Sequence, residues 1–99
     1  MDERTFDQID EALCQRTRLA IMASLAAVGK LDFVEIKARL NLTAGNLSVH
    51  LSALEKAQYV RIEKSFQGRK PLTSVWMTDQ GRKALKRYVN LLQSILSEP

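Results

Sequence analysis

Residues 32–54 of the chain read DFVEIKARLNLTAGNLSVHLSAL, and this stretch carries the strongest signals for the fold. Asp32 and Glu35 have the spacing of a capping box, which predicts a short helix that begins directly after Asp32. Asn41 tolerates a left-handed backbone better than most non-glycine residues, so it can end this helix and turn the chain. Thr43 is a suitable N-cap for a second helix. The stretch therefore predicts two helices joined by a turn of only a few residues.

The second helix of this pair has two contrasting faces. Leu47, Leu51 and Leu54 lie at i, i+4 and i+7, which gives one narrow buried stripe. Two helices joined by so short a turn form a helix-turn-helix. A face without bulky side chains can approach the floor of a DNA major groove, whereas an ordinary solvated helix usually carries more charge. The opposite face here holds only small or polar residues, namely Gly45, Asn46, Val49, Ser52, Ala53 and Lys56.

The segments upstream of the pair also have helical spacing. Phe6, Ile9 and Leu13, here called the N-terminal stripe, lie at i, i+3 and i+7. The pattern is compatible with one helix or with two helices joined near residues 14–16. Gly29 can adopt the left-handed conformation of a C-cap and should end this block. The helical spacing continues before it through Leu19, Met22, Leu25 and Ala26.

Downstream of the pair the apolar period changes to two. Residues 59–66 and 72–78 are rich in β-formers, and residues 67–71 between them read QGRKP, a turn sequence. We expect a β-hairpin with Arg69 and Lys70 at its tip. Two cations at such a tip suit contact with phosphates or with a narrow minor groove, although solvated turn charges would have the same sequence.

A long helix is expected over residues 79–97, with Thr78 as its N-cap and Asp79 in its first turn. Its apolar stripe is wider than packing on one small domain needs. We interpret the excess as a subunit interface to which the N-terminal stripe contributes, and deeper burial by the chain's own domain is the alternative. The expected interface residues are Leu85, Tyr88, Val89, Leu92, Ile95 and Leu96.

The composition is that of one ordinary globular domain. The chain has 99 residues, of which 45% are apolar and 26% charged. We expect a single domain over residues 1–99, with a core over about 16–78 and the terminal helix over about 79–97. The net charge of +4 is uneven, since the first 11 residues carry five acids and one base and leave 14 bases and six acids for the remainder. A basic body suits a polyanionic partner, but charge alone fits a merely soluble basic surface equally well.

Several function classes are disfavoured. No apolar run is long enough to span a membrane, and the acidic start lacks the features of a signal peptide, so a cytoplasmic location is expected. Cys14 is interpreted as a core residue, with a redox sensor as the alternative. His50 lies at the edge of the leucine stripe and fits either a phosphate or base contact or a half-buried side chain bonded to backbone. One His and one Cys do not make a zinc site, and with no cofactor motif and no catalytic constellation an enzyme is not expected.

The order helix, helix-turn-helix, hairpin, long helix is that of a winged helix. The chain resembles the short winged helix-turn-helix DNA-binding regulators related to the MarR and ArsR groups of bacterial and archaeal repressors, over about four-fifths of its length. Three positions depart from the family pattern: Gln58 stands for a usual Gly, Leu72 for a common base, and Val49 for a frequent cation. The matching segments, in order, are LDF (31–33), LTAGNLSVHL (42–51), LEKA (54–57), YV (59–60), GRKP (68–71) and MTDQGR (77–82).

This resemblance implies a mainly α fold with a small β-hairpin and a long C-terminal dimerisation helix. It further implies a homodimer on a palindromic or near-palindromic DNA site, with one helix in the major groove and the hairpin, or wing, along the backbone or minor groove. The positions expected to contact DNA are Thr43, Gly45, Asn46, Ser48, Val49, His50 and Ser52 in the helix and Gln67, Arg69 and Lys70 in the wing.

The sequence therefore predicts sequence-specific binding of double-stranded DNA by a dimeric transcriptional regulator, a repressor. A winged helix used for protein–protein interaction without DNA readout is the alternative, because the helix expected to read DNA carries little charge. RNA binding is a weaker hypothesis, since no aromatic stacking platform is visible. A small-molecule effector would have to bind at the dimer interface or between the long helix and the core.

Overall fold

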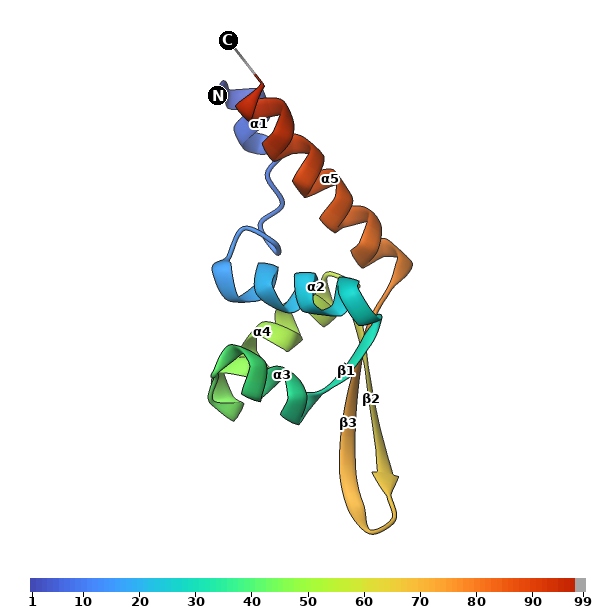
Figure 1. The fold of residues 1–99 in the computed structure, drawn as a ribbon. Coiled ribbons are helices and arrows are strands. Elements are labelled where there is room, and N and C mark those ends of the chain that lie inside the picture. The colour runs from blue at the N-terminus through green and yellow to red at the C-terminus, as the bar shows by residue number, and fades with distance from the viewer. Residues whose placement is uncertain (98–99) are drawn as a thin grey trace.

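A long helix and a long hairpin project in opposite directions from a bundle of three helices (Figure 1). The computed structural model describes residues 1–97 and measures 57 × 25 × 21 Å along its principal axes. The predicted fold class is confirmed, since the chain is mostly helical with a small antiparallel sheet. The elements are α1 (Glu3–Asp7), α2 (Arg16–Val28), β1 (Lys30–Asp32), α3 (Phe33–Leu40), α4 (Ala44–Lys56), β2 (Val60–Gln67), β3 (Lys70–Met77) and α5 (Asp79–Leu96).

The helix-turn-helix of α3 and α4 is held by the caps that the sequence predicts. Glu35 donates its backbone N–H to Asp32 Oδ1 at 2.7 Å, and the Glu35 carboxylate accepts from the Asp32 N–H at 3.2 Å, which completes a capping box. Asn41 is left-handed, with φ 53°. Thr43 Oγ1 accepts the N–H of Asn46 at 3.1 Å and starts α4. Local capping thus fixes where α3 ends and where α4 begins.

The sheet has one strand more than the predicted hairpin. β1 pairs with β3 in the strand order β1-β3-β2, with Leu31 opposite Val75. Three residues are too few to show an alternating pattern, and this strand exists because β3 offers it a free edge. The hairpin itself is longer than expected, since β2 and β3 pair from Val60–Met77 out to Gln67–Lys70 and leave only Gly68 and Arg69 in the turn.

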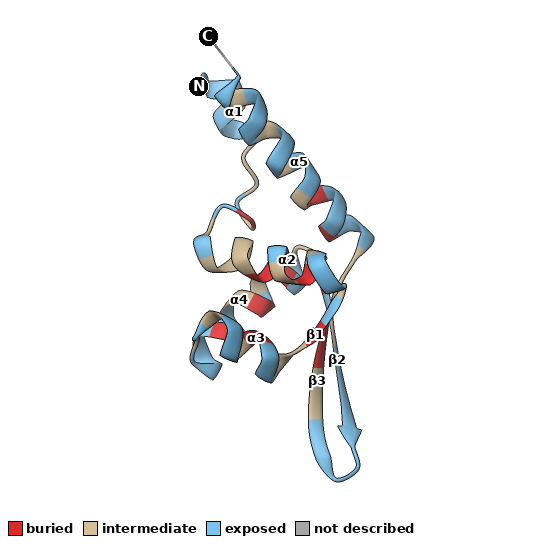
Figure 2. Cartoon of the chain, viewed as in Figure 1, coloured by how far each residue is buried: buried red, intermediate tan, exposed pale blue. Residues whose placement is uncertain are grey.

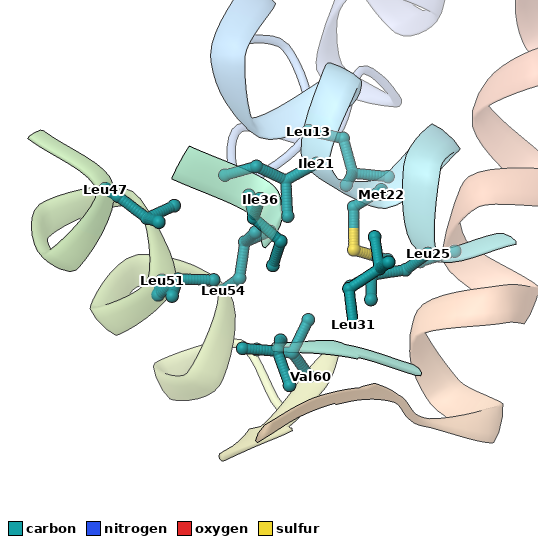
Figure 3. Close-up of a cluster of buried hydrophobic side chains, with 12 residues drawn as sticks. Leu13, Ile21, Met22, Leu25, Leu31, Ile36, Leu47, Leu51, Leu54 and Val60 are labelled. Atoms are coloured by element: carbon teal, nitrogen blue, oxygen red, sulfur yellow. The ribbon is translucent and has the colours of Figure 1, made fainter. Parts of the chain in front are cut away.

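One hydrophobic core joins α2, α3, α4 and the base of the sheet (Figure 3). Leu13 is fully buried in this core, so it cannot lie at a subunit interface as the rest of the N-terminal stripe can. It lies in the segment between α1 and α2, and the two-helix alternative for the N-terminal region therefore holds. The buried hydrophobic residues are Leu13, Ile21, Met22, Leu25, Leu31, Ile36, Leu47, Leu51, Leu54, Val60, Val75 and Ala84.

The start of α5 is pressed against the junction between α4 and the wing. Thr78 Oγ1 donates to the Gln58 carbonyl at 2.7 Å and accepts from the Gly81 N–H at 2.9 Å. A Cβ atom built on Gly81 would lie 2.1 Å from the Tyr59 carbonyl oxygen, so only glycine fits there. This close packing fixes the base of the wing relative to α5. No helix within residues 1–97 is both long and apolar enough to cross a membrane.

Candidate nucleic-acid interface

The outward face of α4 is exposed and almost uncharged. Leu47, Leu51 and Leu54 are buried against the core, as predicted, and they hold the helix by its inner face. Val49, on the outer face, has 64% of its surface exposed. The helix therefore presents small polar side chains from a fixed backbone, which suits close approach to the edges of bases. The predicted contact residues that are exposed here are Thr43, Gly45, Asn46, Ser48, Val49 and Ser52.

His50, the remaining predicted contact residue on α4, is half-buried. Its Nδ1 accepts a hydrogen bond from Arg18 Nε of α2 at 3.3 Å, so its partner is a side chain and not the backbone. An imidazole that accepts at Nδ1 and is neutral carries its proton on Nε2, which leaves that atom as a donor. Arg18 and His50 thus form a cross-helix pair at the edge of the α4 face.

The wing carries its predicted contact residues at its far end. Gln67, Arg69 and Lys70 are all exposed, and Gly68 has the positive φ of 65° that a two-residue turn of this kind needs. The base of the wing is anchored by Val60 and Val75, which are buried in the core. Beyond that base the hairpin is exposed along most of its length (Figure 2).

A groove of about 510 Å³ separates α4 from the wing. Three hydroxyl groups and one ammonium group line it, from Ser48 and Ser52 of α4 and from Thr73 and Lys64 of the wing. Each of these groups can donate a hydrogen bond to an acceptor-rich strand, and the Glu55 carboxylate of α4 is the acidic group in the lining. The remaining lining residues of the groove are Phe33, Leu51 and Ile62.

Lys64 is the cation in the groove, and the sequence pattern did not predict it as a contact residue. In sequence it belongs to a mixed run of charges and β-formers that is typical of a solvated strand. A signal was nevertheless present, because Lys64 is two residues from Ile62 and therefore shares the face of β2 that packs toward the core. β2 extends beyond the hydrophobic core, so a cation on the core-facing side of its outer part faces the space between the wing and α4.

The other face of the sheet uses its cations differently. Trp76 of β3 lies between Lys30 of β1 and Arg61 of β2, its cross-strand partners, whose charged groups are 4.9 and 5.2 Å from the ring centroid. Arg61 also pairs with Glu63 at 3.4 Å. These two cations are engaged by an aromatic ring and a carboxylate on the side of the sheet away from the groove. Within residues 1–97, the wing cations that neither a carboxylate nor an aromatic ring engages are Lys64, Arg69 and Lys70.

A family model for the winged helix DNA-binding domain matches residues 17–96. The chain belongs to the winged helix DNA-binding domain family. It is 38% identical over 72 residues to the uncharacterized protein MJ0432 of Methanocaldococcus jannaschii. The aligned segment covers 73% of this chain and 78% of that protein. The predicted resemblance to winged helix-turn-helix regulators is thereby confirmed.

Solved structures show the same winged helix. A transcriptional regulator homologue from Pyrococcus horikoshii superposes with a TM-score of 0.87 at 33% identity, over 94% of both chains. The Mycobacterium tuberculosis transcriptional regulator MosR, solved in complex with DNA, superposes with a TM-score of 0.70 over 96% of this chain and 68% of that one. At 18% identity, the second match shows the fold alone.

The end of this winged helix domain opposite the wing tip is formed by α5 and the N-terminal segment. Of the predicted interface residues, Leu85, Tyr88 and Ile95 are half-buried, whereas Val89, Leu92 and Leu96 are exposed. Figure 2 shows that the outer half of α5 is largely exposed. An apolar stripe therefore remains open in the single chain.

The loop between α1 and α2 ties the N-terminus to the winged helix core. The Tyr59 hydroxyl donates a hydrogen bond to the Asp10 carboxylate. The pKa of Tyr59 is raised above its ordinary value mainly by burial and secondly by this hydrogen bond. A groove of about 500 Å³ between this loop and α5 includes Asp10, Arg87 and Tyr88. Cys14 is exposed and donates to the Glu11 carbonyl at 3.3 Å, so its interpretation as a core residue is wrong: the chain leaves the helical stripe before reaching it.

Proposed function

We propose that this protein is a homodimeric transcriptional regulator that binds duplex DNA sequence-specifically and acts as a repressor. The observation that carries the proposal is that the exposed, mostly small and polar face of α4 and the cationic wing lie on the two sides of one groove, into which Ser48, Ser52, Thr73 and Lys64 can donate. A major groove admits an α-helix, and the neighbouring backbone and minor groove lie beside it. The groove between α4 and the wing then holds the sugar-phosphate strand that separates the two DNA grooves.

In this arrangement α4 reads bases. Asn46 lies in the first turn of α4, the part of a recognition helix that contacts base edges. Its amide can both donate and accept, which matches the paired acceptor and donor that adenine presents in the major groove. Ser48, Val49 and Ser52 would contact bases or phosphates beside it, and Thr43, Gly45 and His50 would contact the DNA at the edge of this interface.

The wing and the groove supply contacts to the backbone. Lys64 lies inside the groove, and Arg69 and Lys70 lie at the wing tip beside the exposed Gln67. Phosphates attract these cations in any sequence, so this part of the interface adds affinity without choosing a site. Arg16 and Arg39, also exposed, would add weaker phosphate contacts near the helix-turn-helix.

The proposed dimer forms through α5. Leu92 and Leu96 have 39% and 84% of their surfaces exposed, and Phe6 of α1 has 66%. Burying such a stripe against its symmetry mate is favourable at about 25 cal/mol per Å² of apolar surface. A two-fold dimer would present two α4 helices to half-sites about one helical turn apart, and a protein that occupies such a site can block transcription from it.

The proposal is tested by selecting bound sequences from random duplex DNA and titrating the binding of the selected duplex with salt. We expect an inverted-repeat site and an affinity that falls steeply as salt rises, because bound phosphates release counterions. Single-stranded DNA of the same sequence is the control and should bind more weakly. Failure to enrich any duplex, with little dependence on salt, would contradict the proposal and favour the protein-interaction hypothesis.

A further inference from the structure

The outer part of the wing carries an aromatic side chain that the fold does not use. Phe66 of β2 has 74% of its surface exposed, although it is one of only three phenylalanines in the chain. Its cross-strand partner is Pro71 of β3, which is also exposed. A cross-strand pair of this kind contributes at most about 1 kcal/mol to a hairpin, whereas an exposed aromatic ring on a strand favours aggregation. The position of Phe66 therefore needs another explanation.

The strand register shows which way this pair faces. Side chains two residues apart on a strand share a face, so Phe66 lies on the same face of β2 as Lys64 and Ile62. Opposite them on β3 stand Pro71, Thr73 and Val75. Ile62, Lys64 and Thr73 line the groove against α4, and Val75 is in the core. Phe66 and Pro71 therefore extend the groove-facing side of the wing by one step, toward the tip.

The neighbours of this apolar pair are cationic. Lys64 precedes Phe66 by two residues, about 7 Å along the strand, and Arg69 and Lys70 follow it at the turn. Lys64 shares the face of Phe66, whereas Lys70, next to Pro71, lies on the opposite face at the tip. A partner that packs on Phe66 therefore meets Lys64 directly and the tip cations at the edge of the ribbon. A DNA strand has that chemistry, because its phosphates alternate with deoxyribose rings whose C–H groups are apolar.

We propose that Phe66, backed by Pro71, packs against deoxyribose rings at the minor-groove edge of the bound DNA strand, while Lys64 and the tip cations hold the flanking phosphates. This inference rests on the proposed function and adds to it a residue that positions the wing without neutralising any phosphate. Phe66 lies on the flat face of the ribbon and not at its apex, which Gly68 and Arg69 form. It therefore covers sugars from the side and is not placed to wedge between base pairs.

The test compares Phe66→Ala with wild type in a salt titration of duplex binding, with Val28→Ala as the control. Val28 is the last residue of α2 and is 55% exposed. Helix α2 lies in the helical bundle, away from the wing tip (Figure 1). Partial burial of one phenyl ring in each wing of the dimer is worth about tenfold in affinity. We expect Phe66→Ala to weaken binding about tenfold at every salt concentration with an unchanged salt slope, and Val28→Ala to bind like wild type.

Further measurements separate the possible outcomes. Thermal unfolding of Phe66→Ala should match wild type, and Phe66→Leu should keep most of the affinity. Wild-type affinity in Phe66→Ala would overturn the inference and leave the proposed function intact. A flattened salt slope would have the same consequence, because it would mean that Phe66 acts only by positioning the cations. Energy transfer between the ends of a labelled duplex should be equal for wild type and variant, and a bend lost with the ring would show insertion between bases instead. A wild-type chain that binds no duplex would overturn both proposals.

Discussion

α4 and the wing differ in both charge and support. The outer face of α4 is nearly uncharged, and the helix is held along its length by three buried leucines. The wing carries exposed cations at Lys64, Arg69 and Lys70, and beyond Val60 and Val75 it is held mainly by pairing between its own two strands. The rigid element is thus the neutral one, and the projecting element is the charged one.

This difference indicates a division of labour on DNA. Reading a base edge requires polar groups at fixed positions, which a helix anchored in the core provides. Attraction to phosphate is sequence-independent and tolerates small displacements, so a projecting ribbon can supply it. We therefore expect changes in α4 to alter the choice of site and changes in the wing to alter affinity for every duplex.

The largest effect is expected when the dimer is disrupted, because each chain then binds DNA with only one α4 and one wing. Leu92→Glu combined with Leu96→Glu places charges on the exposed stripe of α5, and we expect monomers that bind an inverted-repeat site at least about a hundredfold more weakly, because linked half-sites gain that much from effective concentration. Light scattering and binding titrations measure the two outcomes. Asn90→Glu combined with Lys83→Gln makes the same change in net charge at exposed polar positions on the opposite side of α5 and should leave the dimer intact. A Leu92/Leu96 variant that remains dimeric would contradict the proposed interface.

The next effect isolates α4. Asn46→Ala should lose about 1–3 kcal/mol of discrimination between the preferred site and a site changed at the base it reads, because one bidentate contact is removed. Binding to random duplex should change little, and a competition assay between the two duplexes measures this. Asn90→Ala, an exposed asparagine of α5, is the control. Unchanged preference in the Asn46 variant would show that α4 does not read bases through this residue.

The smallest effect concerns the joint between the two elements. Gln58 follows α4 with φ 67°, and the Tyr59 N–H reaches the Leu54 carbonyl at 2.9 Å, which makes a Schellman motif with a glutamine where glycine is favoured. Gln58→Gly removes the left-handed strain and should raise the free energy of unfolding by about 0.5–1 kcal/mol. Gln67→Gly, the same change in a β-strand, should instead lower it. Urea unfolding measures both, and a destabilised Gln58→Gly would show that the glutamine side chain holds this joint.

Local signals predicted most of the fold. The capping residues Asp32, Thr43 and Thr78 and the left-handed Asn41 act within four residues of themselves, so their roles are visible in sequence. β1 was missed because its pairing with β3 depends on residues more than 40 positions away. The placement of Leu13 and Cys14 differs from the prediction for a related reason: helical spacing continues through residues 8–15, but this segment forms a loop.

The candidate site was predictable in part. Its exposed residues on α4 and at the wing tip follow from helical and strand periodicity. The groove between them does not, because it depends on how far the wing stands from α4. The Arg18–His50 hydrogen bond also joins residues 32 positions apart, and no local sequence pattern predicts that these two side chains meet.

The division of labour is tested most directly by comparing salt slopes of duplex binding for wild type, Asn46→Ala and the double variant Arg69→Ala, Lys70→Ala. Each phosphate contact contributes about −0.9 to the slope, so removing two cations from each wing of a dimer should flatten it by up to about four units. We expect this flattening in the wing variant, with similar losses on every duplex, and an unchanged slope with relaxed site preference in Asn46→Ala. An unaltered slope in the wing variant would contradict the proposed roles of α4 and the wing, because it would show that the wing does not contact DNA.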